Sequence, residues 1–335
     1  MAQVELTAAA AIEVEAGLLA VPVFEEDMSG SPRGVVLDLD RKLERHLSAA
    51  AKEEGFRGKP DEALQLHTVG RLPAARVMLL GLGPRAKADA IARAGFEPLR
   101  MAAGKAARAA ARAGVQELGV ALPGELTAAG AARAVAEGAL LGAYKFERYK
   151  SEKQEKRALR TVVIATGDGP ARAADVREAA RLGQRIAAAV AWARDLVNEA
   201  PMHCTPTRLA RAAQELAREA GLACEVRGPK EIASLGMGMF LGVTRGSAEP
   251  PRLVKVSWEP RRGAGAPPLV LVGKAITFDS GGLSLKPTES MVTMNSDMAG
   301  SAAVLATMRI VAELAPPFPV HVLLGACENM PGGRA

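Results

Sequence analysis

Two lysines and two aspartates fall in one short stretch of the sequence. Lys274 comes two residues and Asp279 seven residues after the apolar run Leu269-Val-Leu-Val272, and Lys286 lies seven residues further on. Asp297 precedes the small-residue run that opens the next helix. The apolar run, which comes just after a Pro-Pro pair, predicts a buried strand of a parallel sheet. Because open α/β sheets place their chemistry at the carboxyl ends of strands, these charged groups predict a site for an ion or a substrate.

Residue spacing alone leaves three interpretations of this stretch open. A lysine after a strand is most often the solvated end of a loop. A phosphate-binding loop fits poorly, because its lysine follows a glycine loop and precedes Ser or Thr, whereas Lys274 precedes Ala275. The third interpretation is a metal site formed by acidic and basic groups at the edge of a sheet.

A longer motif surrounds these residues and favours the metal site. It runs Gly273-Lys-Ala-Ile-Thr-Phe-Asp-Ser-Gly-Gly-Leu-Ser-Leu-Lys-Pro287 and is followed by Met294-x-x-Asp297-Met-x-Gly-x-Ala. This pattern resembles the metal-binding core of the leucyl aminopeptidase family (peptidase family M17), the two-metal cytosolic aminopeptidases. The motif is long and nearly unbroken, so the resemblance is specific.

The resemblance implies roles for five residues of this chain. Lys274 is expected to bind a metal through its neutral amine, and Asp279 and Asp297 through their carboxylates, with Asp279 shared by both metals. Lys286 is expected to be a charged catalytic residue, and Met294 to line the pocket for the first side chain of the substrate. The resemblance also implies two divalent metal ions, most simply zinc or manganese, peptide substrates with an N-terminal Leu or other apolar residue, and a hexamer.

Two further stretches resemble the same family. One is Gly138-x-x-Leu-x-x-Tyr-x-Phe-x-x-Tyr-Lys150, which in the family marks the end of the N-terminal domain. The other combines Asn198-Glu-Ala-Pro201 with Thr205-Pro-Thr-Arg-Leu-Ala210. In the second stretch, Thr205 is predicted to cap a helix whose first residue is a proline.

The alternation of short apolar runs with Ala-rich helical patterns predicts an α/β fold. We expect an N-terminal α/β domain over 1–172, a linker helix over 173–198 and a metallo-aminopeptidase catalytic domain over 199–335. The catalytic domain is expected to contain a mixed, largely parallel sheet that is incomplete in this chain. The predicted strands are 35–37, 76–80, 161–165, 224–227, 252–258, 269–272 and 319–326, and the predicted helices are 86–94, 99–113, 128–143, 173–198, 206–220 and 299–314.

The sequence is expected to lack the C-terminal third of a family member. After Glu328-Asn-Met-Pro331, the resemblance predicts a later motif, Asn-Thr-Asp-x-Glu-Gly-Arg, which would supply two more acidic ligands and a catalytic arginine. The sequence stops at Ala335 without it. Three hypotheses follow: the chain is a fragment of a longer product, another chain completes it, or it has lost its activity.

Composition narrows the functional class. The chain has 335 residues, of which 49% are hydrophobic, so it can form two domains with packed cores. Its three cysteines are scattered, which indicates a reducing compartment, and no apolar stretch approaches the length of a membrane span. A cytoplasmic location without membrane partners is therefore expected.

Two rival functions remain at this point. The net charge of +6 permits a non-enzymatic family member that binds DNA or another partner, although acids and bases are interspersed along the chain. A nucleotide-binding enzyme could use Gly81-Leu-Gly83-Pro-Arg-Ala86, but Pro84 interrupts the glycine turn of a dinucleotide fingerprint. A tight turn between a strand and a helix is the simpler interpretation of that segment.

Overall fold

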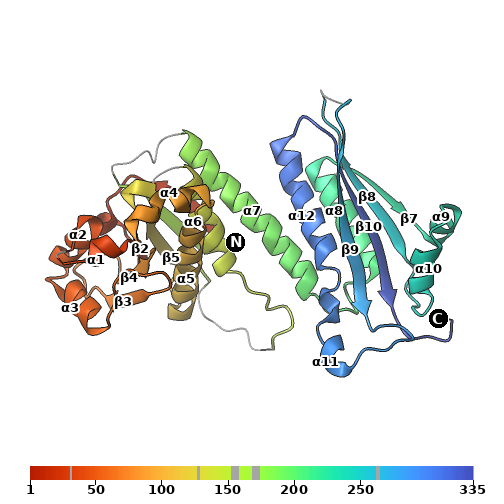
Figure 1. The fold of residues 1–335 in the computed structure, drawn as a ribbon, viewed down its shortest axis with the longest axis horizontal. Helices are drawn as coiled ribbons and strands as arrows, with labels where there is room; N and C mark the ends of the chain where they lie inside the picture. Colours follow the sequence, from red (N-terminus) through yellow and green to blue (C-terminus); the bar gives the residue numbers. More distant parts are fainter. Residues whose placement is uncertain (31, 127–128, 152–157, 168–173, 262–264, 335) are drawn as a thin grey trace. The chain divides into compact units, whose positions relative to one another are not determined.

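The computed structural model forms two compact units, Met1–Ala188 and Ala189–Ala335, and each is described by itself (Figure 1). The division falls within helix α7 (Ala174–Asn198). The structure describes all residues of the chain except 31, 127–128, 152–157, 168–173, 262–264 and 335.

The first unit is built on a six-stranded sheet with the order β1-β6-β5-β2-β4-β3. All neighbouring strands are parallel except β3, which pairs antiparallel with β4 at the edge. The central strand β2 is buried along its whole length, as expected for a parallel strand covered on both faces. The strands are β1 (Gln3–Thr7), β2 (Leu18–Val23), β3 (Ala63–His67), β4 (Arg76–Gly81), β5 (Glu117–Ala121) and β6 (Thr161–Ala165).

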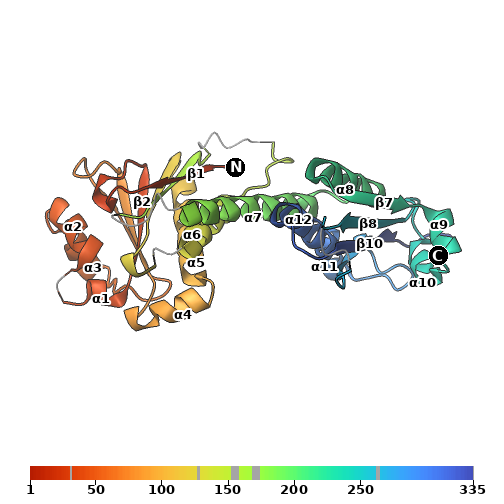
Figure 2. The same cartoon turned by 90° about the horizontal axis from the view of Figure 1, so that it is seen from above.

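Helices cover both faces of this sheet, with α2 and α3 on one side and α5 and α6 on the other (Figures 1 and 2). Alternate residues of β2 supply the two cores: Leu18 and Ala20 join the α5–α6 core, and Leu19 and Val21 join the opposite one. The helices and turns are η1 (Ala11–Glu13), α1 (Glu25–Met28), α2 (Gly34–Lys42), α3 (His46–Glu53), η2 (Arg85–Lys87), α4 (Ala88–Arg93), α5 (Glu97–Ala113), η3 (Gly124–Leu126) and α6 (Ala129–Gly142).

One strand predicted in the first unit is wrong. Residues 35–37 lie inside helix α2, not in a strand. Val36, Leu39 and Leu43 are buried there, three and four residues apart, which is helical spacing. The three adjacent apolar residues were too few to distinguish a strand from a buried helix turn.

The second unit contains a four-stranded mixed sheet with the order β7-β8-β10-β9. β9 and β10 are parallel, while β7–β8 and β8–β10 are antiparallel. Helices α8 and α12 pack on one face and bury alternate apolar residues of β8 and β10. The strands are β7 (Ala223–Arg227), β8 (Arg252–Trp258), β9 (Leu269–Asp279) and β10 (Val320–Asn329).

Helices α8 and α12 begin and end at the predicted residues, whereas the shorter helices of the second unit were not predicted. Thr205 caps α8, since its hydroxyl accepts a hydrogen bond from the Arg208 amide at 3.3 Å, and Pro206 is the first helical residue. The cap predicted from the sequence is therefore confirmed. The helices and turns are α8 (Pro206–Ala220), α9 (Pro229–Ser234), α10 (Gly238–Thr244), α11 (Thr288–Met291), η4 (Met294–Ser296) and α12 (Ala299–Leu314). No helix in the described part of the chain is long and apolar enough to cross a membrane.

Strand β9 differs from its prediction in length and in burial. It continues past Gly273 to Asp279, because its register with β10 holds from Leu269 to the end of both strands apart from one irregularity. Gly273 does not end the strand. A Cβ there would lie 2.7 Å from the Ser301 Cα, so glycine permits α12 to approach the strand. β9 is also an edge strand rather than a buried one, and Val272 is 75% exposed.

Candidate metal and substrate site

Asp279 lies where β9 ends and accepts three hydrogen bonds. Its Oδ1 accepts from the Gly281 amide at 2.9 Å and from the Asn329 side-chain amide at 2.7 Å, and its Oδ2 accepts from Lys286 Nζ at 2.9 Å. Asp279 is 9% exposed. The sequence prediction that groups Asp279 with Lys286 on one segment therefore corresponds to a direct ion pair.

The environment of Asp279 favours its ionised form. Burial alone would raise the pKa of this carboxyl group, but the hydrogen bonds from Lys286, the Gly281 amide and Asn329 outweigh burial and lower it. The carboxylate is therefore held as an anion, which is the form that can bind a cation.

The loop after Asp279 returns Lys286 to the carboxylate. Gly281 and Gly282 adopt φ angles of +91° and +65°, a region that favours glycine. A Cβ on Gly281 would lie 2.2 Å from the Ser284 carbonyl oxygen. The two glycines therefore permit the tight turn, which the Lys286 amide closes by donating to the Ser280 carbonyl at 2.9 Å.

A second ion pair joins Lys274 and Asp297. Lys274 Nζ lies 2.7 Å from Asp297 Oδ1, although the two residues come from different elements, β9 and the turn before α12. The lysine side chain is 57% exposed, whereas that of Asp297 is 16% exposed. Among the described residues, Asp297 Oδ2 is buried without a hydrogen-bond partner. A buried carboxylate oxygen that is left unpaired is costly and is suited to meet a cation.

Cys327 lies in β10, two residues before Asn329, which pairs with Asp279. Burial, and after it the negative charges of Asp279, Glu328 and Asp297, raise the pKa of the Cys327 thiol to about 11. The same shift keeps the thiol protonated, so Cys327 is not an activated nucleophile.

Met294, the remaining site residue predicted from the sequence, begins η4 and is half-buried. Turn η4 packs against β9, the strand that carries Lys274 and Asp279. Met294 thus lies on the segment of the chain that joins Lys286 to Asp297.

These residues fit a divalent cation only in part. No group of three or more His, Cys, Asp or Glu side chains is placed to hold a metal within the described ranges. Two carboxylates and one amine that can become neutral are nevertheless suitable ligands for several divalent metals. The unpaired oxygen of Asp297 supports the fit, and Lys274 would have to exchange its ion pair for a metal bond.

Asn329 is the polar contact of Asp279 that sequence reasoning missed. Its neighbours Glu328, Met330 and Pro331 were recognised as part of a family motif, but no role was attached to the asparagine. The available signal was its position three residues after the predicted strand 319–326, which the structure extends to Asn329. Its contact with Asp279 depends on the register of β9 and β10, which the sequence does not reveal.

The glycine turn after β4 is packed against the protein itself. The Arg85 guanidinium lies over the Phe24 ring, 4.9 Å from its centroid, and pairs with Asp27. The segment continues into the short turn η2 and the short helix α4, not into a long helix that could receive a pyrophosphate at its first turn. This geometry corresponds to the structural interpretation of Gly81–Ala86.

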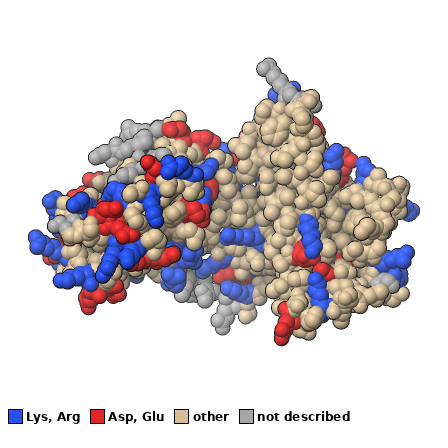
Figure 3. Space-filling model, viewed as in Figure 1, with Lys and Arg blue, Asp and Glu red and all other residues tan. Residues whose placement is uncertain are grey.

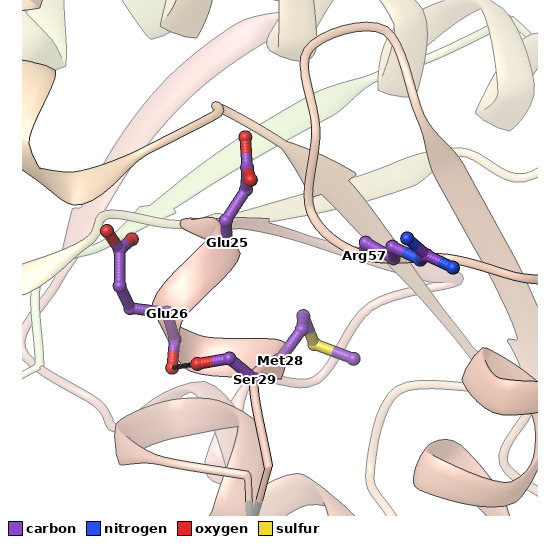
Figure 4. Close-up of a pocket in the computed structure, with 5 residues that line it drawn as sticks. All are labelled: Glu25, Glu26, Met28, Ser29 and Arg57. Carbon is purple, nitrogen blue, oxygen red and sulfur yellow. Dashed lines mark hydrogen bonds between the residues drawn. The ribbon is translucent and has the colours of Figure 1, made fainter.

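A pocket of about 470 Å³ in the first unit has no convergent polar groups. It is lined by Glu25, Glu26, Met28, Ser29 and Arg57 (Figure 4). The carboxylates of Glu25 and Glu26 lie apart from each other, and the Arg57 guanidinium points away from both. The dashed bond in the picture joins the Ser29 hydroxyl to the Glu26 main-chain oxygen.

Comparison with known proteins identifies both units. Residues 20–153 match the model of the cytosol aminopeptidase family, N-terminal domain, and residues 191–335 match that of the cytosol aminopeptidase family, catalytic domain. A probable cytosol aminopeptidase of Solibacter usitatus is 40% identical over 96% of this chain and 62% of the relative. One from Aquifex aeolicus is 38% identical over 95% of this chain and 60% of the relative.

Solved structures agree with this assignment. A mutant of tomato leucine aminopeptidase superposes with a TM-score of 0.85 at 27% identity, over 100% of this chain and 64% of the other. The bottromycin maturation enzyme BotP in complex with Mn gives a TM-score of 0.74 at 34% identity, over 96% and 61% of the two chains.

The matches cover nearly the whole chain but not the whole of its relatives. The chain spans 59% to 65% of the length of the curated relatives named probable cytosol aminopeptidase. Two matching family models, curated relatives and solved structures all point to one assignment. The chain belongs to the cytosol aminopeptidase family, M17.

Proposed function

We propose that the second unit carries part of a metal-dependent aminopeptidase site, with Lys274, Asp279 and Asp297 as metal ligands. The observation that supports this most is the unpaired, buried Oδ2 of Asp297 beside the Lys274 amine. Asp279 provides a second carboxylate, held ionised, on the strand that also carries Lys274. The family suggests two divalent ions, and a structural neighbour was solved with Mn.

A divalent metal, when bound, polarises a carbonyl group and makes bound water more acidic. The residues of this chain would provide the surroundings for that chemistry. Lys274 would release Asp297 and bind through its neutral amine. Lys286 would remain an ammonium group, held in place by Asp279, and would stabilise negative charge that develops on the substrate carbonyl oxygen. Met294 would contact the first side chain of the substrate and favour Leu or another apolar residue.

The domain boundaries proposed from the sequence are kept as a proposal. These are an N-terminal α/β domain over 1–172, a linker helix over 173–198 and a catalytic domain over 199–335. The family models leave 154–190 between their two matches, and the contact boundary falls within α7. Both observations support a connecting role for this helix.

The substrates, assembly and location of the protein are proposed from its family. The names of the relatives support peptide substrates and a cytosolic location. A hexamer remains an expectation from the family resemblance. No observation favours the rival nucleic-acid function, since lysines and arginines are mixed with acidic residues on the face seen in Figure 3.

Hydrolysis of a leucine anilide with added Mn²⁺ tests the proposed activity. We expect turnover by the wild-type protein that a chelator abolishes. Lys286→Ala should reduce kcat by about 100- to 1000-fold, the usual effect of removing a group that stabilises an oxyanion. The matched control is Lys255→Ala. Lys255 lies in β8 of the same unit, and its Nζ is 3.9 Å from a carboxylate oxygen of Glu225.

The controls decide how the result is interpreted. Lys255→Ala should retain wild-type turnover. Equal losses in both lysine variants would show that positive charge in general, and not Lys286, supports catalysis. Wild-type protein that binds Mn²⁺ but hydrolyses no leucine anilide would contradict the proposed activity of this chain.

A further inference from the structure

Asn329 lies opposite Asp279 at the end of two parallel strands. The register of β9 and β10 pairs them directly, after an irregularity between Cys327 and Glu328. The Asn329 side-chain amide donates to Asp279 Oδ1 at 2.7 Å. Successive side chains alternate between the two faces of a sheet. A shift of the β9–β10 register by one residue would therefore turn the Asn329 side chain away from Asp279.

The backbone and the side chain of Asn329 are both fixed. Its carbonyl oxygen accepts from the Ser280 amide at 2.9 Å and from the Ser280 hydroxyl at 2.7 Å. Its amide oxygen lies against Gly282, where an added Cβ would be 2.5 Å from it. Ser280 and Gly282 therefore hold Asn329 in the orientation that faces Asp279.

The contacts of Asp279 divide its two oxygens between different partners. Oδ1 accepts from both the Gly281 amide and Asn329, which uses the two lone pairs of a carboxylate oxygen. Oδ2 accepts only from Lys286 among the hydrogen bonds of the described residues. Rotation of the carboxylate would break two hydrogen bonds at once, so its orientation is set by the asparagine and the loop.

We infer that Asn329 is a positioning residue for the site: it locks Asp279 so that Oδ2 faces Lys286 and remains open to a cation. The part of this inference that concerns the cation rests on the proposed function. The part that concerns Asp279 does not. Partners that orient a metal ligand in this way usually change metal affinity strongly when they are removed.

The first test uses metal-free protein and measures thermal unfolding. Asn329→Ala removes the donor, and Asn329→Asp keeps the shape of the side chain while placing a second carboxylate against Asp279. We expect Asn329→Asp to lower the Tm more than Asn329→Ala, because like charges then face each other. Asp279→Asn added to Asn329→Asp should recover part of the loss, since it restores one donor and one acceptor.

The second test measures Mn²⁺ binding by electron paramagnetic resonance. Asn329→Ala should weaken binding by about 10- to 100-fold, a loss typical of partners that orient a ligand. The matched control is Trp258→Phe, which removes one hydrogen bond, from Trp258 Nε1 to the Pro316 carbonyl at 3.1 Å, at the far end of the same sheet. It should lower the Tm without changing Mn²⁺ affinity.

The two tests separate the inference from the proposed function. If the Tm losses of Asn329→Asp and Asp279→Asn are simply additive, Asn329 does not hold Asp279 and the inference is overturned. If Mn²⁺ binding is unchanged in Asn329→Ala, the positioning role is overturned, even if the Tm measurements show that Asn329 and Asp279 are hydrogen-bonded. If the wild-type protein binds no Mn²⁺, the proposed metal site fails, and the Tm measurements alone decide whether Asn329 orients Asp279.

Discussion

At the residue scale, the site is organised by charges that compensate one another. Asp279 and Asp297 each face a lysine, and both carboxylates are largely buried. The family motif identified these four residues from the sequence, but it gave no indication of which lysine meets which aspartate. The pairing follows from the close turn at Gly281 and Gly282 and from the approach of α12 to β9, which are properties of the folded chain.

Burial of Cys204 makes the stability of the protein sensitive to alkaline pH. Burial, and after it the charge of Glu199, raises the pKa of this thiol from 9.0 to about 11, while Arg208 acts in the opposite direction. A raised folded-state pKa contributes stability that is complete below the unfolded pKa and is lost as pH rises through the folded value. Wild-type stability should therefore decline between pH 9.0 and about 11.

Urea unfolding of the wild-type protein and Cys204→Ala across this pH range measures the effect. The variant lacks the thiol, so its free energy of unfolding should decline less steeply, with the difference approaching about 2–3 kcal/mol at the alkaline end. Parallel curves for the two proteins would show that Cys204 does not ionise on unfolding in this range.

At the element scale, long helices could be predicted from the sequence more reliably than strands. The Ala-rich patterns gave α5, α6, α8 and α12 to within a few residues, because helical periodicity is a local property. The strands β1, β2, β3 and β5 were not predicted. β1, β2 and β5 are short and their partners lie far away in the sequence, so that pairing rather than local pattern determines them. β3 is a short edge strand that pairs with the nearby β4.

The length of β9 is the error that most affects the site. The prediction ends the strand before Gly273, whereas in the structure the strand continues and this glycine lets α12 pack against it. Lys274 therefore lies within the strand and reaches Asp297 near the start of α12, while the loop begins only after Asp279. A glycine that permits close packing and a glycine that ends a strand look the same in one sequence.

The contact at Gly273 gives a prediction for α12. In Gly273→Ala, the new methyl group would lie 2.7 Å from both Ser301 Cα and Val304 Cγ2. Because α12 must move away, the free energy of unfolding should fall by about 1–3 kcal/mol, and Asp297 should separate from Lys274.

Chemical denaturation of Gly273→Ala measures the loss of stability. Gly242→Ala is the control: it lies within α10, nothing is within 4 Å of an added Cβ, and alanine favours the helix. The control should be neutral or slightly stabilising. An equally stable Gly273→Ala protein would show that α12 does not depend on this close approach.

At the scale of the whole molecule, one edge of β9 pairs with no other strand among the described residues. β9 is the last strand in its sheet, and its exposed residues Leu269, Val270 and Val272 are apolar. Figure 3 shows a broad face of the second unit with few charged side chains. Exposed apolar edge strands promote pairing between chains, so this surface predicts association of the chain with itself.

Val272→Lys should suppress that association, because charged residues protect an edge strand. Sedimentation velocity over a range of protein concentrations measures the result. The matched control is Val243→Lys, which places the same charge on an exposed valine of α10, outside the sheet. The control should associate like the wild-type protein. Equal association of the Val272→Lys protein and the wild type would rule out the β9 edge as the contact.

The proposed site depends on a divalent metal held by the carboxylates of Asp279 and Asp297. Anomalous diffraction from crystals soaked in Mn²⁺ tests it most directly, because the signal locates the metal among the side chains. We expect a peak bonded to an oxygen of each aspartate, with Lys274 moved out of its ion pair. Crystals in which Mn²⁺ binds elsewhere, or in which both aspartates keep their lysine partners at saturating Mn²⁺, would contradict it.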